Sequence, residues 1–104
     1  MTNSQGNPSN FFLFDNDLDE EVTNLFNSST ALAIDTEAMG LMHGRDRICL
    51  VQICDEKDNV ACVRISLGQT SAPKLKLLLE SLLIEKVFHF ARFDVAALKN
   101  GLKI

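Results

Sequence analysis

Residues 48–54 form an almost unbroken apolar run, and this run constrains the fold more than any other feature of the sequence. Only Gln52 interrupts it, so the pattern is neither the alternation of a half-exposed strand nor the period of an amphipathic helix. A continuous run of this length is typical of a central strand that is covered on both faces of a sheet. A second apolar run, at 31–34, predicts another buried strand, which continues into three polar residues at 35–37.

The other segments predict an α/β fold around these two strands. The polar segment 55–59 is typical of a hairpin connection, after which residues 60–65 return as the third strand of an antiparallel meander. Two further strands are expected, at 11–14 on a sheet edge and at 86–89. Three helices are expected. The first is capped by Asp17 and has one apolar stripe of Leu18, Val22, Leu25 and Phe26, and the second is capped by Ser71 and buries Leu75, Leu78, Leu79 and Leu82. The third covers 91–100 and is terminated by Gly101.

Composition sets the class of protein. The chain has 104 residues, 46% of them hydrophobic and 23% charged, which predicts one small globular domain over 11–104 after a flexible terminus at 1–10. Its formal net charge of −4 argues against broad electrostatic capture of nucleic acid. It has no apolar run that could span a bilayer and no secretory signal, so we expect no membrane partner. The three cysteines form no Cys-x-x-Cys motif, which predicts small buried thiols in a reducing, cytoplasmic location.

Asp35 and Glu37 are the most informative polar pair. Side chains two positions apart on a strand project from the same face, so both carboxylates point together from the end of a buried strand. Like charges held this close repel, and a hard divalent cation such as Mg²⁺ or Mn²⁺ binds through oxygen ligands and relieves the repulsion. The alternative is that the strand simply ends here and solvent surrounds both acids.

Asp94 is the third candidate residue. It falls in the first turn of the last predicted helix, shortly after the strand at 86–89, and beside the apolar stripe of that helix. Its alternative role is local, because the N-terminus of a helix stabilises an acid in its first turn. We expect His89 to be a core or capping histidine rather than a metal ligand.

Two motifs in this order and spacing resemble a known family. The segment 33–37, AIDTE, followed by residues 47–53, RICLVQI, resembles the first exonuclease motif and second strand of ribonuclease D. The segment 86–98, KVFHFARFDVAAL, resembles the second motif of the same family. The resemblance covers residues 11–104 and implies the N-terminal part of a 3′–5′ exonuclease domain of the four-carboxylate (DEDD) superfamily. The implied fold is a ribonuclease H-like mixed sheet, an antiparallel meander followed by βα units, truncated before the last motif.

The resemblance also implies a site and an activity. Asp35, Glu37 and Asp94 would be the catalytic residues and would hold two divalent metal ions, Mg²⁺ or Mn²⁺. The substrate would be the single-stranded 3′ end of an RNA, such as a tRNA precursor or another structured RNA. The products would be nucleoside 5′-monophosphates. The residues that follow the first acid, from Thr36 to Met39, would lie against the terminal nucleotide.

The third motif of the family, a Tyr or His four residues before a fourth catalytic Asp, has no counterpart in these 104 residues, which contain no Tyr. We therefore expect the chain alone to bind metal weakly and to be inactive. Two alternatives remain. One is a 3′–5′ DNA exonuclease. The other is a catalytically inactive half-domain that binds RNA or a protein partner, with a homodimer as one form of that association.

Overall fold

The computed structural model describes residues 10–39, 47–88 and 91–104, with the backbone alone at 39, 47 and 91–93. In chain order the elements are β1 (Asn10–Asp15), α1 (Glu20–Asn27), β2 (Ala31–Met39), β3 (Arg47–Asp55), β4 (Asn59–Arg64), α2 (Pro73–Leu79), β5 (Glu85–Phe88) and α3 (Ala91–Leu102). This is the predicted order of strands and helices. Most of the segment expected to be flexible, residues 1–9, lies outside the described residues, while Asn10 already belongs to β1.

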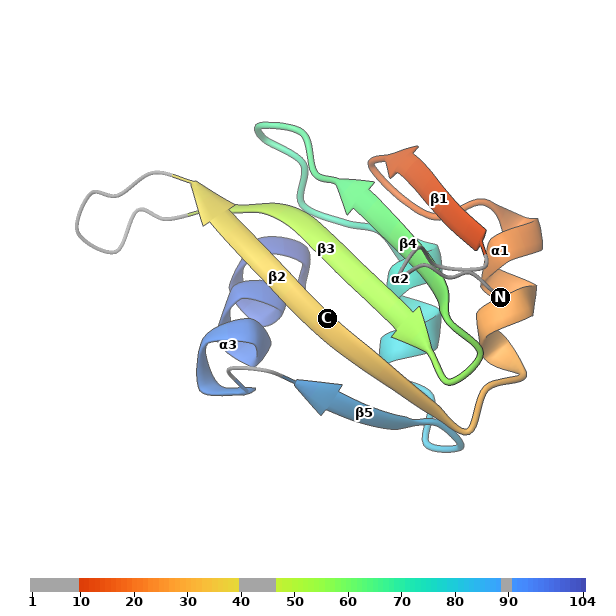
Figure 1. Ribbon diagram of the computed structural model, residues 1–104. Coiled ribbons are helices and arrows are strands. Elements are labelled where there is room, and N and C mark those ends of the chain that lie inside the picture. Colours follow the sequence, from red (N-terminus) through yellow and green to blue (C-terminus); the bar gives the residue numbers. More distant parts are fainter. Residues whose placement is uncertain (1–9, 40–46, 89–90) are drawn as a thin grey trace.

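The five strands form one mixed sheet in the order β1-β4-β3-β2-β5 (Figure 1). Strands β2, β3 and β4 make the antiparallel meander that the polar hairpin at 55–59 predicts. The two outer strands pair in parallel with their neighbours, β1 with β4 and β5 with β2. The aromatic run at the start of the chain is therefore an edge strand, as predicted.

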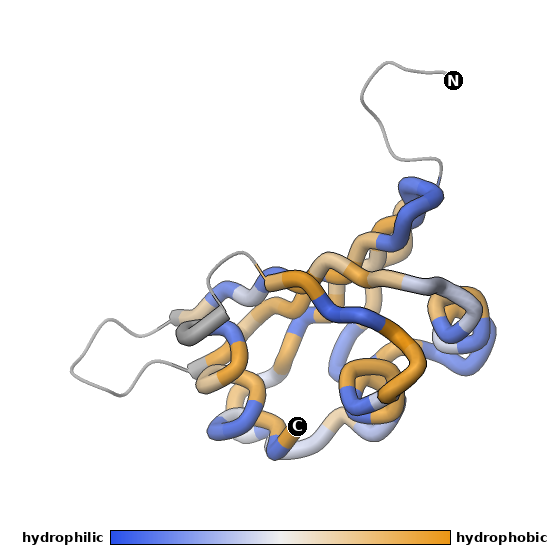
Figure 2. The backbone as a smooth tube through the Cα atoms, turned by 90° about the horizontal axis from the view of Figure 1, so that it is seen from below, coloured by the Kyte–Doolittle hydropathy of each residue, from blue (hydrophilic) through white to orange (hydrophobic). Residues whose placement is uncertain are grey.

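All three helices lie on one face of this sheet, as two perpendicular views show (Figures 1 and 2). The core fills the layer between helices and sheet because both present apolar residues with the period of their own element. From the sheet come Leu32, Ile34, Val51, Ile53, Ala61 and Val63, and from the helices Val22, Phe26, Leu75, Leu78, Leu98 and Leu102, all buried.

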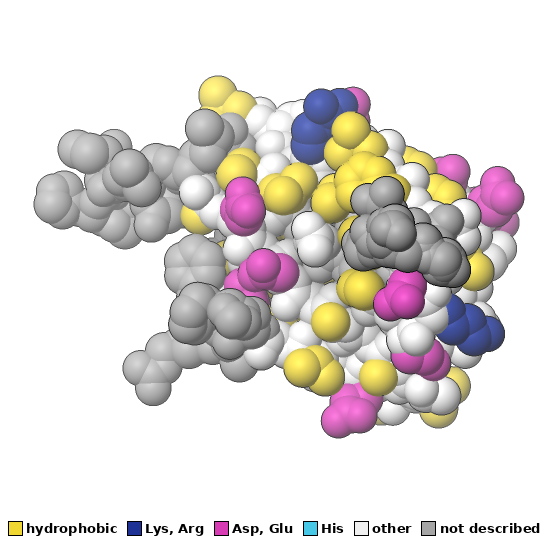
Figure 3. All heavy atoms as spheres, viewed as in Figure 1, with side chains coloured by type: hydrophobic (Ala, Val, Ile, Leu, Met, Phe, Trp, Pro, Cys, Tyr) yellow, Lys and Arg dark blue, Asp and Glu magenta, His cyan; other side chains and the backbone are white. Residues whose placement is uncertain are grey.

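The opposite face of the sheet is not covered by any described element, and we call it the open face (Figure 3). Its side chains alternate with the buried ones along each strand. The strand registers place on this face Phe11, Leu13, Asp15, Ala31, Ala33, Asp35, Glu37, Leu50, Gln52, Cys54, Val60, Cys62, Arg64, Glu85 and Val87, of which Cys62 alone is buried. The prediction that residues 48–54 are covered on both faces was therefore wrong for the described part of the chain, where Leu50 and Cys54 are only half-buried.

The helix caps also differ from the predicted ones. The N-cap of α1 is Asp19, whose side chain accepts a hydrogen bond of 2.8 Å from the backbone N–H of Val22. Asp17, the predicted cap, instead accepts from the backbone N–H groups of Lys74 and Leu75 in the first turn of α2, at 2.9 and 3.0 Å. The N-cap position of α2 is Ala72 rather than Ser71, and it makes no side-chain cap bond.

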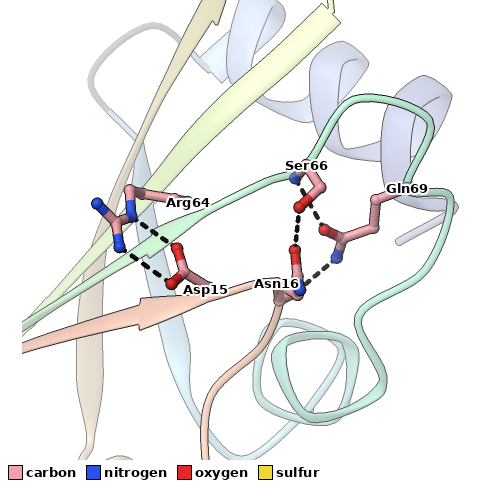
Figure 4. Close-up of polar contacts among 5 residues, drawn as sticks. All are labelled: Asp15, Asn16, Arg64, Ser66 and Gln69. Carbon is pink, nitrogen blue, oxygen red and sulfur yellow. Dashed lines mark hydrogen bonds and ion pairs between the residues drawn. The ribbon is translucent and has the colours of Figure 1, made fainter.

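A polar network ties the end of β1 to the loop that follows β4 (Figure 4). Arg64 donates two hydrogen bonds to the carboxylate of Asp15, at 2.7 and 3.0 Å. Next to this ion pair, the Ser66 hydroxyl donates a hydrogen bond to the side-chain oxygen of Asn16. The side chain of Gln69 accepts from the Ser66 backbone N–H at 3.0 Å and donates to the backbone oxygen of Asn16. These contacts hold the loop so that Asp17 reaches α2.

Two predicted details of the second half were wrong. Gly101 does not terminate α3 but lies inside it, where an added Cβ would come within 2.7 Å of Ile48 Cγ2. The helix instead ends through Lys103, which has a positive φ of 60°, a left-handed conformation common after the last helical residue. Leu82 is almost fully exposed because α2 has already ended at Leu79.

The cysteines are all free, as predicted from their number and spacing. Only Cys62 is buried, whereas Cys49 and Cys54 are half-buried, so the expectation of three buried thiols was met in one case. Within the described part of the chain, no helix is long and apolar enough to cross a membrane.

Candidate active site

Asp35 and Glu37 lie on the open face of β2, where both side chains are exposed. The alternation of the strand puts them there, because their neighbours Ile34 and Thr36 are buried on the helical face. Across the antiparallel ladder, Asp35 pairs with Gln52 and Glu37 with Leu50 of β3. The two predicted carboxylates are therefore side by side on one surface, as the spacing of the motif requires.

The position of the pair in the sheet is equally informative. Strand β5 runs parallel to β2 and pairs with it only as far as Ile34 and Phe88. Asp35 therefore lies one residue beyond the last described pair, at the carboxyl end of β5. In open α/β sheets, ligands bind outside the carboxyl ends of parallel strands. The pair thus occupies the place in this topology where a site is expected.

A β-bulge lies directly beside Glu37. The register of β2 and β3 shifts between Glu37 and Ala38, which leaves Cys49 as an extra residue on β3. The thiol of Cys49 approaches the backbone oxygen of Glu37 at 3.3 Å. Bulges bend a strand and re-aim its side chains, and they are common next to active sites. Sequence patterns do not reveal this bulge, because an apolar run has no alternation from which a shift could be detected.

Asp94 lies in the first turn of α3 and is 1% exposed. Its Oδ1 accepts a hydrogen bond of 2.6 Å from the Thr36 hydroxyl, and the Thr36 side chain is itself 6% exposed. Thr36 faces the helices, so the third predicted acid approaches β2 from the side opposite to Asp35 and Glu37. Of the residues predicted to contact a terminal nucleotide, Thr36 thus has its side chain directed to Asp94, and the side chain of Met39 lies outside the described residues.

The donor chemistry of the site fits a hard divalent cation. Asp35 and Glu37 offer exposed carboxylate oxygens, which Mg²⁺ and Mn²⁺ prefer as ligands. Among the described side chains, no group of three or more His, Cys, Asp or Glu lies close enough together to hold a metal ion. Asp35 and Glu37 are therefore the two carboxylates of this site that solvent reaches. Asp94 is buried on the helical side of β2.

The open face next to Asp35 is hollowed. A shallow depression of about 360 Å³ is lined by Ala33, Asp35, Gln52, Cys54 and Val87, together with parts of Ile34 and Phe88. Gln52 is the polar residue that sequence reasoning left without a role. Its signals in the sequence are that it interrupts the apolar run and that it belongs to the segment 47–53, which resembles ribonuclease D.

Glu37 also influences a nearby thiol on the open face. Burial raises the pKa of Cys62, and the negative charge of Glu37 raises this pKa further. The Cys62 thiol lies 3.5 Å from the side-chain oxygen of Gln52. The thiol is thus kept protonated beside the carboxylates and is not an activated nucleophile.

Comparison with known proteins identifies the class to which this fold and site belong. The family model described as 3′-5′ exonuclease matches residues 11–104. The chain belongs to this 3′–5′ exonuclease family, and its relatives include the ribonuclease D-like DEDD enzymes. Curated proteins give no match to the sequence.

Solved structures agree with this assignment. The structure of Brucella melitensis NrnC with bound Mg²⁺ is 39% identical, with a TM-score of 0.78 over 89% of this chain and 45% of that one. Brucella melitensis NrnC bound to pGG is 38% identical, with a TM-score of 0.79 over 91% and 45% of the two chains. Escherichia coli RNase D, at 21% identity, shares the fold with a TM-score of 0.68 over 88% and 24%. The predicted ribonuclease H-like fold is confirmed, and the chain spans less than half the length of these structures.

Proposed function

We propose that this chain is the N-terminal part of a metal-dependent 3′–5′ exoribonuclease, which shortens RNA from single-stranded 3′ ends and releases nucleoside 5′-monophosphates. The observation that carries the proposal is the placement of Asp35 and Glu37, exposed side by side at the carboxyl end of β5, with Asp94 in the helix that follows. The choice of RNA is supported by the similarity to ribonuclease D in the strand that contains residues 47–53 and by the pGG bound to NrnC. Trimming of tRNA precursors or other structured RNAs in the cytoplasm is the role we infer.

Asp35, Glu37 and Asp94 are the residues that would hold the metal ions, and the Mg²⁺ in NrnC supports this cofactor. Two divalent ions held there would supply activation of a water molecule and stabilisation of the leaving 3′ oxygen. The carboxylates would act on the substrate end through these ions, because without a cation they repel the phosphodiester. The substrate end would lie beside the edge of β2, where no described strand pairs beyond Ile34. The backbone from Thr36 to Met39 is the surface that we assign to the terminal nucleotide.

The proposal is tested first by metal binding to the 104-residue chain. The chain is titrated with Mn²⁺, and the electron paramagnetic resonance signal reports the concentration of the free ion. This experiment measures metal affinity and does not require the chain to be catalytically active. We expect weak but measurable binding that Asp35→Asn, Glu37→Gln and Asp94→Asn each reduce. The matched control is Asp58→Asn, which removes an exposed carboxylate at the β3–β4 turn. Asparagine tolerates the positive φ of 67° at that position, so binding should not change.

Activity is tested in a polypeptide that contains these residues together with the missing third motif. Matched RNA and DNA oligonucleotides labelled at the 5′ end should shorten stepwise with Mg²⁺ or Mn²⁺ and not with a chelator. The same three substitutions should abolish the shortening. Faster loss of the DNA would favour the alternative of a 3′–5′ DNA exonuclease, and wild-type rates in any variant would remove that residue from the site.

The open face favours a second candidate function. Phe11 and Leu13 on the β1 edge and Val87 on the β5 edge are each more than half exposed on it. Exposed apolar surface marks association sites when it is extensive. A catalytically inactive half-domain that associates with RNA, with a protein, or with a second copy of itself would use this face. Metal affinity that does not depend on Asp35 or Asp94 would favour this candidate over the exonuclease.

A further inference from the structure

Strand β1 forms one edge of the sheet, and no described strand pairs with its outer side (Figure 1). The backbone N–H of Asn16, just after β1, donates to the backbone oxygen of Arg64 on β4 at 2.7 Å. Backbone polar groups of successive residues point to opposite sides of a strand, so those of Phe11 and Leu13 point away from β4. A row of N–H and C=O groups on this edge is thus directed toward a further strand.

The side chains of β1 make the same edge apolar. Phe11 and Leu13 lie on the open face and are 58% and 52% exposed. Natural proteins protect edge strands from pairing with charges or prolines, and residues 10–14, NFFLF, contain neither. The first charge on the strand is Asp15, which forms an ion pair with Arg64. An uncharged stretch of β1 is therefore open to pairing.

The opposite edge of the sheet is protected. Strand β5 has four residues, Glu85–Phe88, and two of them, Glu85 and Lys86, are charged. A strand added to this edge would lie beside these charges, which disfavours edge pairing. Of the two edges, β1 is therefore the one suited to binding a further strand.

We propose that two copies of this chain form a dimer through antiparallel pairing of their β1 strands. In a two-fold dimer, residue i lies opposite residue j of the second copy, and j lies opposite i. Backbone hydrogen bonds form only where residues whose polar groups point outward lie opposite each other. Phe11 opposite Leu13 of the second copy meets this condition twice across the axis. The pairing also brings together four apolar side chains on the open face, two from each copy.

The side chains select this register over the next one. A shift that places Leu13 opposite Leu13 of the second copy would also match the backbone groups. It would place Phe11 opposite Asp15 of the second copy, however, so an apolar side chain would face a charged one. The register with Phe11 opposite Leu13 pairs residues 10–14 and leaves Asp15 outside the paired stretch, so the hydrophobic pattern favours it.

An edge dimer of this kind keeps the candidate active site accessible. A two-fold axis perpendicular to the sheet joins the two five-stranded sheets into one and leaves both open faces on the same side. Asp35 and Glu37 lie on β2, which β3 and β4 separate from β1. No candidate metal ligand takes part in the pairing, so failure of the dimer would leave the proposed exonuclease site untouched.

Sedimentation velocity of the 104-residue chain over a range of concentrations tests the dimer. Phe11→Lys puts a charge into the paired edge and should weaken dimerisation by about 10-fold or more, because that charge is desolvated on association. The matched control is Val87→Lys, since Val87 is 53% exposed on the open face of the other edge strand. It lies far from β1 and should leave the dimer within about 2-fold of the wild type.

A second variant keeps the test decisive if Phe11→Lys does not fold. Leu13→Pro keeps an apolar side chain but removes an N–H that points away from β4, and proline is tolerated on an edge strand at such a position. It should abolish pairing through the backbone. Association of the open faces alone would tolerate this change.

Amide hydrogen exchange measured by NMR identifies the groups that pair. The N–H groups of Phe11 and Leu13 should exchange about 10-fold more slowly at concentrations that favour the dimer, because they become hydrogen-bonded. Unchanged exchange of both groups in a dimer would overturn the proposal, as would equal weakening by Phe11→Lys and Val87→Lys. A chain that is monomeric at all concentrations would also overturn it. So would a species larger than a dimer, since two-fold pairing occupies the β1 edge of both copies.

Discussion

At the scale of single residues, Asp35 and Asp94 are both candidate metal ligands, but their surroundings predict opposite effects on stability. Asp35 is exposed and shares a face of β2 with Glu37, so removing its charge relieves repulsion. Asp35→Asn should leave the free energy of unfolding unchanged or raise it by less than about 0.5 kcal/mol in the absence of metal. Asp94 is buried and bonded to Thr36, so Asp94→Ala leaves a buried hydroxyl without this partner and should cost about 1–3 kcal/mol.

Urea denaturation of the metal-free chain at low salt measures both values. Asp94→Asn is the control for Asp94→Ala, since its amide oxygen can still accept a hydrogen bond from Thr36. A loss of stability in Asp35→Asn equal to that in Asp94→Ala would show that Asp35 is held by structural contacts rather than exposed for a ligand.

The sequence predicted the three acids but not the contact behind them. The two-residue period of a strand is enough to place Asp35 and Glu37 on one face and Thr36 on the other. It does not tell which face α3 covers, and only the resemblance to ribonuclease D places Thr36 against the terminal nucleotide. The partner of Thr36 lies 58 residues away in the chain, and such a pairing depends on tertiary packing rather than on any local pattern.

At the scale of secondary-structure elements, the Asp17 carboxylate acts as a cap for a helix far away in the sequence. It accepts from the N–H groups of Lys74 and Leu75, two of the groups that α2 cannot satisfy internally. Asp17→Ala should therefore lower the free energy of unfolding by about 1–2 kcal/mol. Ser71→Ala, at the position that the sequence pattern favoured, should change it by less than about 0.5 kcal/mol.

Thermal and chemical denaturation of the two variants give this comparison directly. An equal loss in both would mean that Ser71 also caps α2 in solution. The sequence pattern failed here because Asp17 and Asp19 both precede α1, and either one satisfies a local capping rule. Only the packing of α1 beside α2 decides which helix each acid serves.

The β3–β4 hairpin is tied to the start of β2 by a titratable group. The pKa of Glu56 lies below its ordinary value because its carboxylate accepts hydrogen bonds from its own backbone N–H and from the backbone N–H and hydroxyl of Thr30. A folded pKa below the unfolded one stabilises the fold at pH values above the unfolded pKa. This contribution is lost as the pH falls through the folded pKa.

Thr30→Val removes the hydroxyl donor and should move the Glu56 pKa back toward its ordinary value, as measured by carbon NMR of the side-chain carboxyl. The acid limb of the stability profile should flatten in parallel. Thr70→Val, at another exposed threonine, serves as the control. An unchanged Glu56 titration in Thr30→Val would show that the backbone donors alone lower the pKa.

At the scale of the whole molecule, the sheet has one face that helices cover and one that no described element covers. The order of elements and the α/β class followed from periodicity, because strand and helix periods differ over short windows. Periodicity did not predict that helices cover only one face of the sheet. An apolar run predicts that a strand is buried, but it does not identify the element that buries it. Apolar residues of β3 lie on both faces of the sheet. Helices cover one of these faces, and the other is the open face.

This sidedness predicts self-association of the 104-residue chain. Leu13 on β1 is 52% exposed on the open face and lies on an edge strand, where a second copy can pack without rearranging the core. Sedimentation velocity should show a concentration-dependent dimer, and Leu13→Lys should shift it to the monomer because a charge on this face must be desolvated on association. The control is Leu83→Lys, since Leu83 is 91% exposed but lies outside the sheet, just before β5. The contradicting result would be a chain that stays monomeric at all concentrations and binds no hydrophobic dye. It would argue against both self-association and the half-domain alternative, because both require apolar surface to be accessible on the open face in solution.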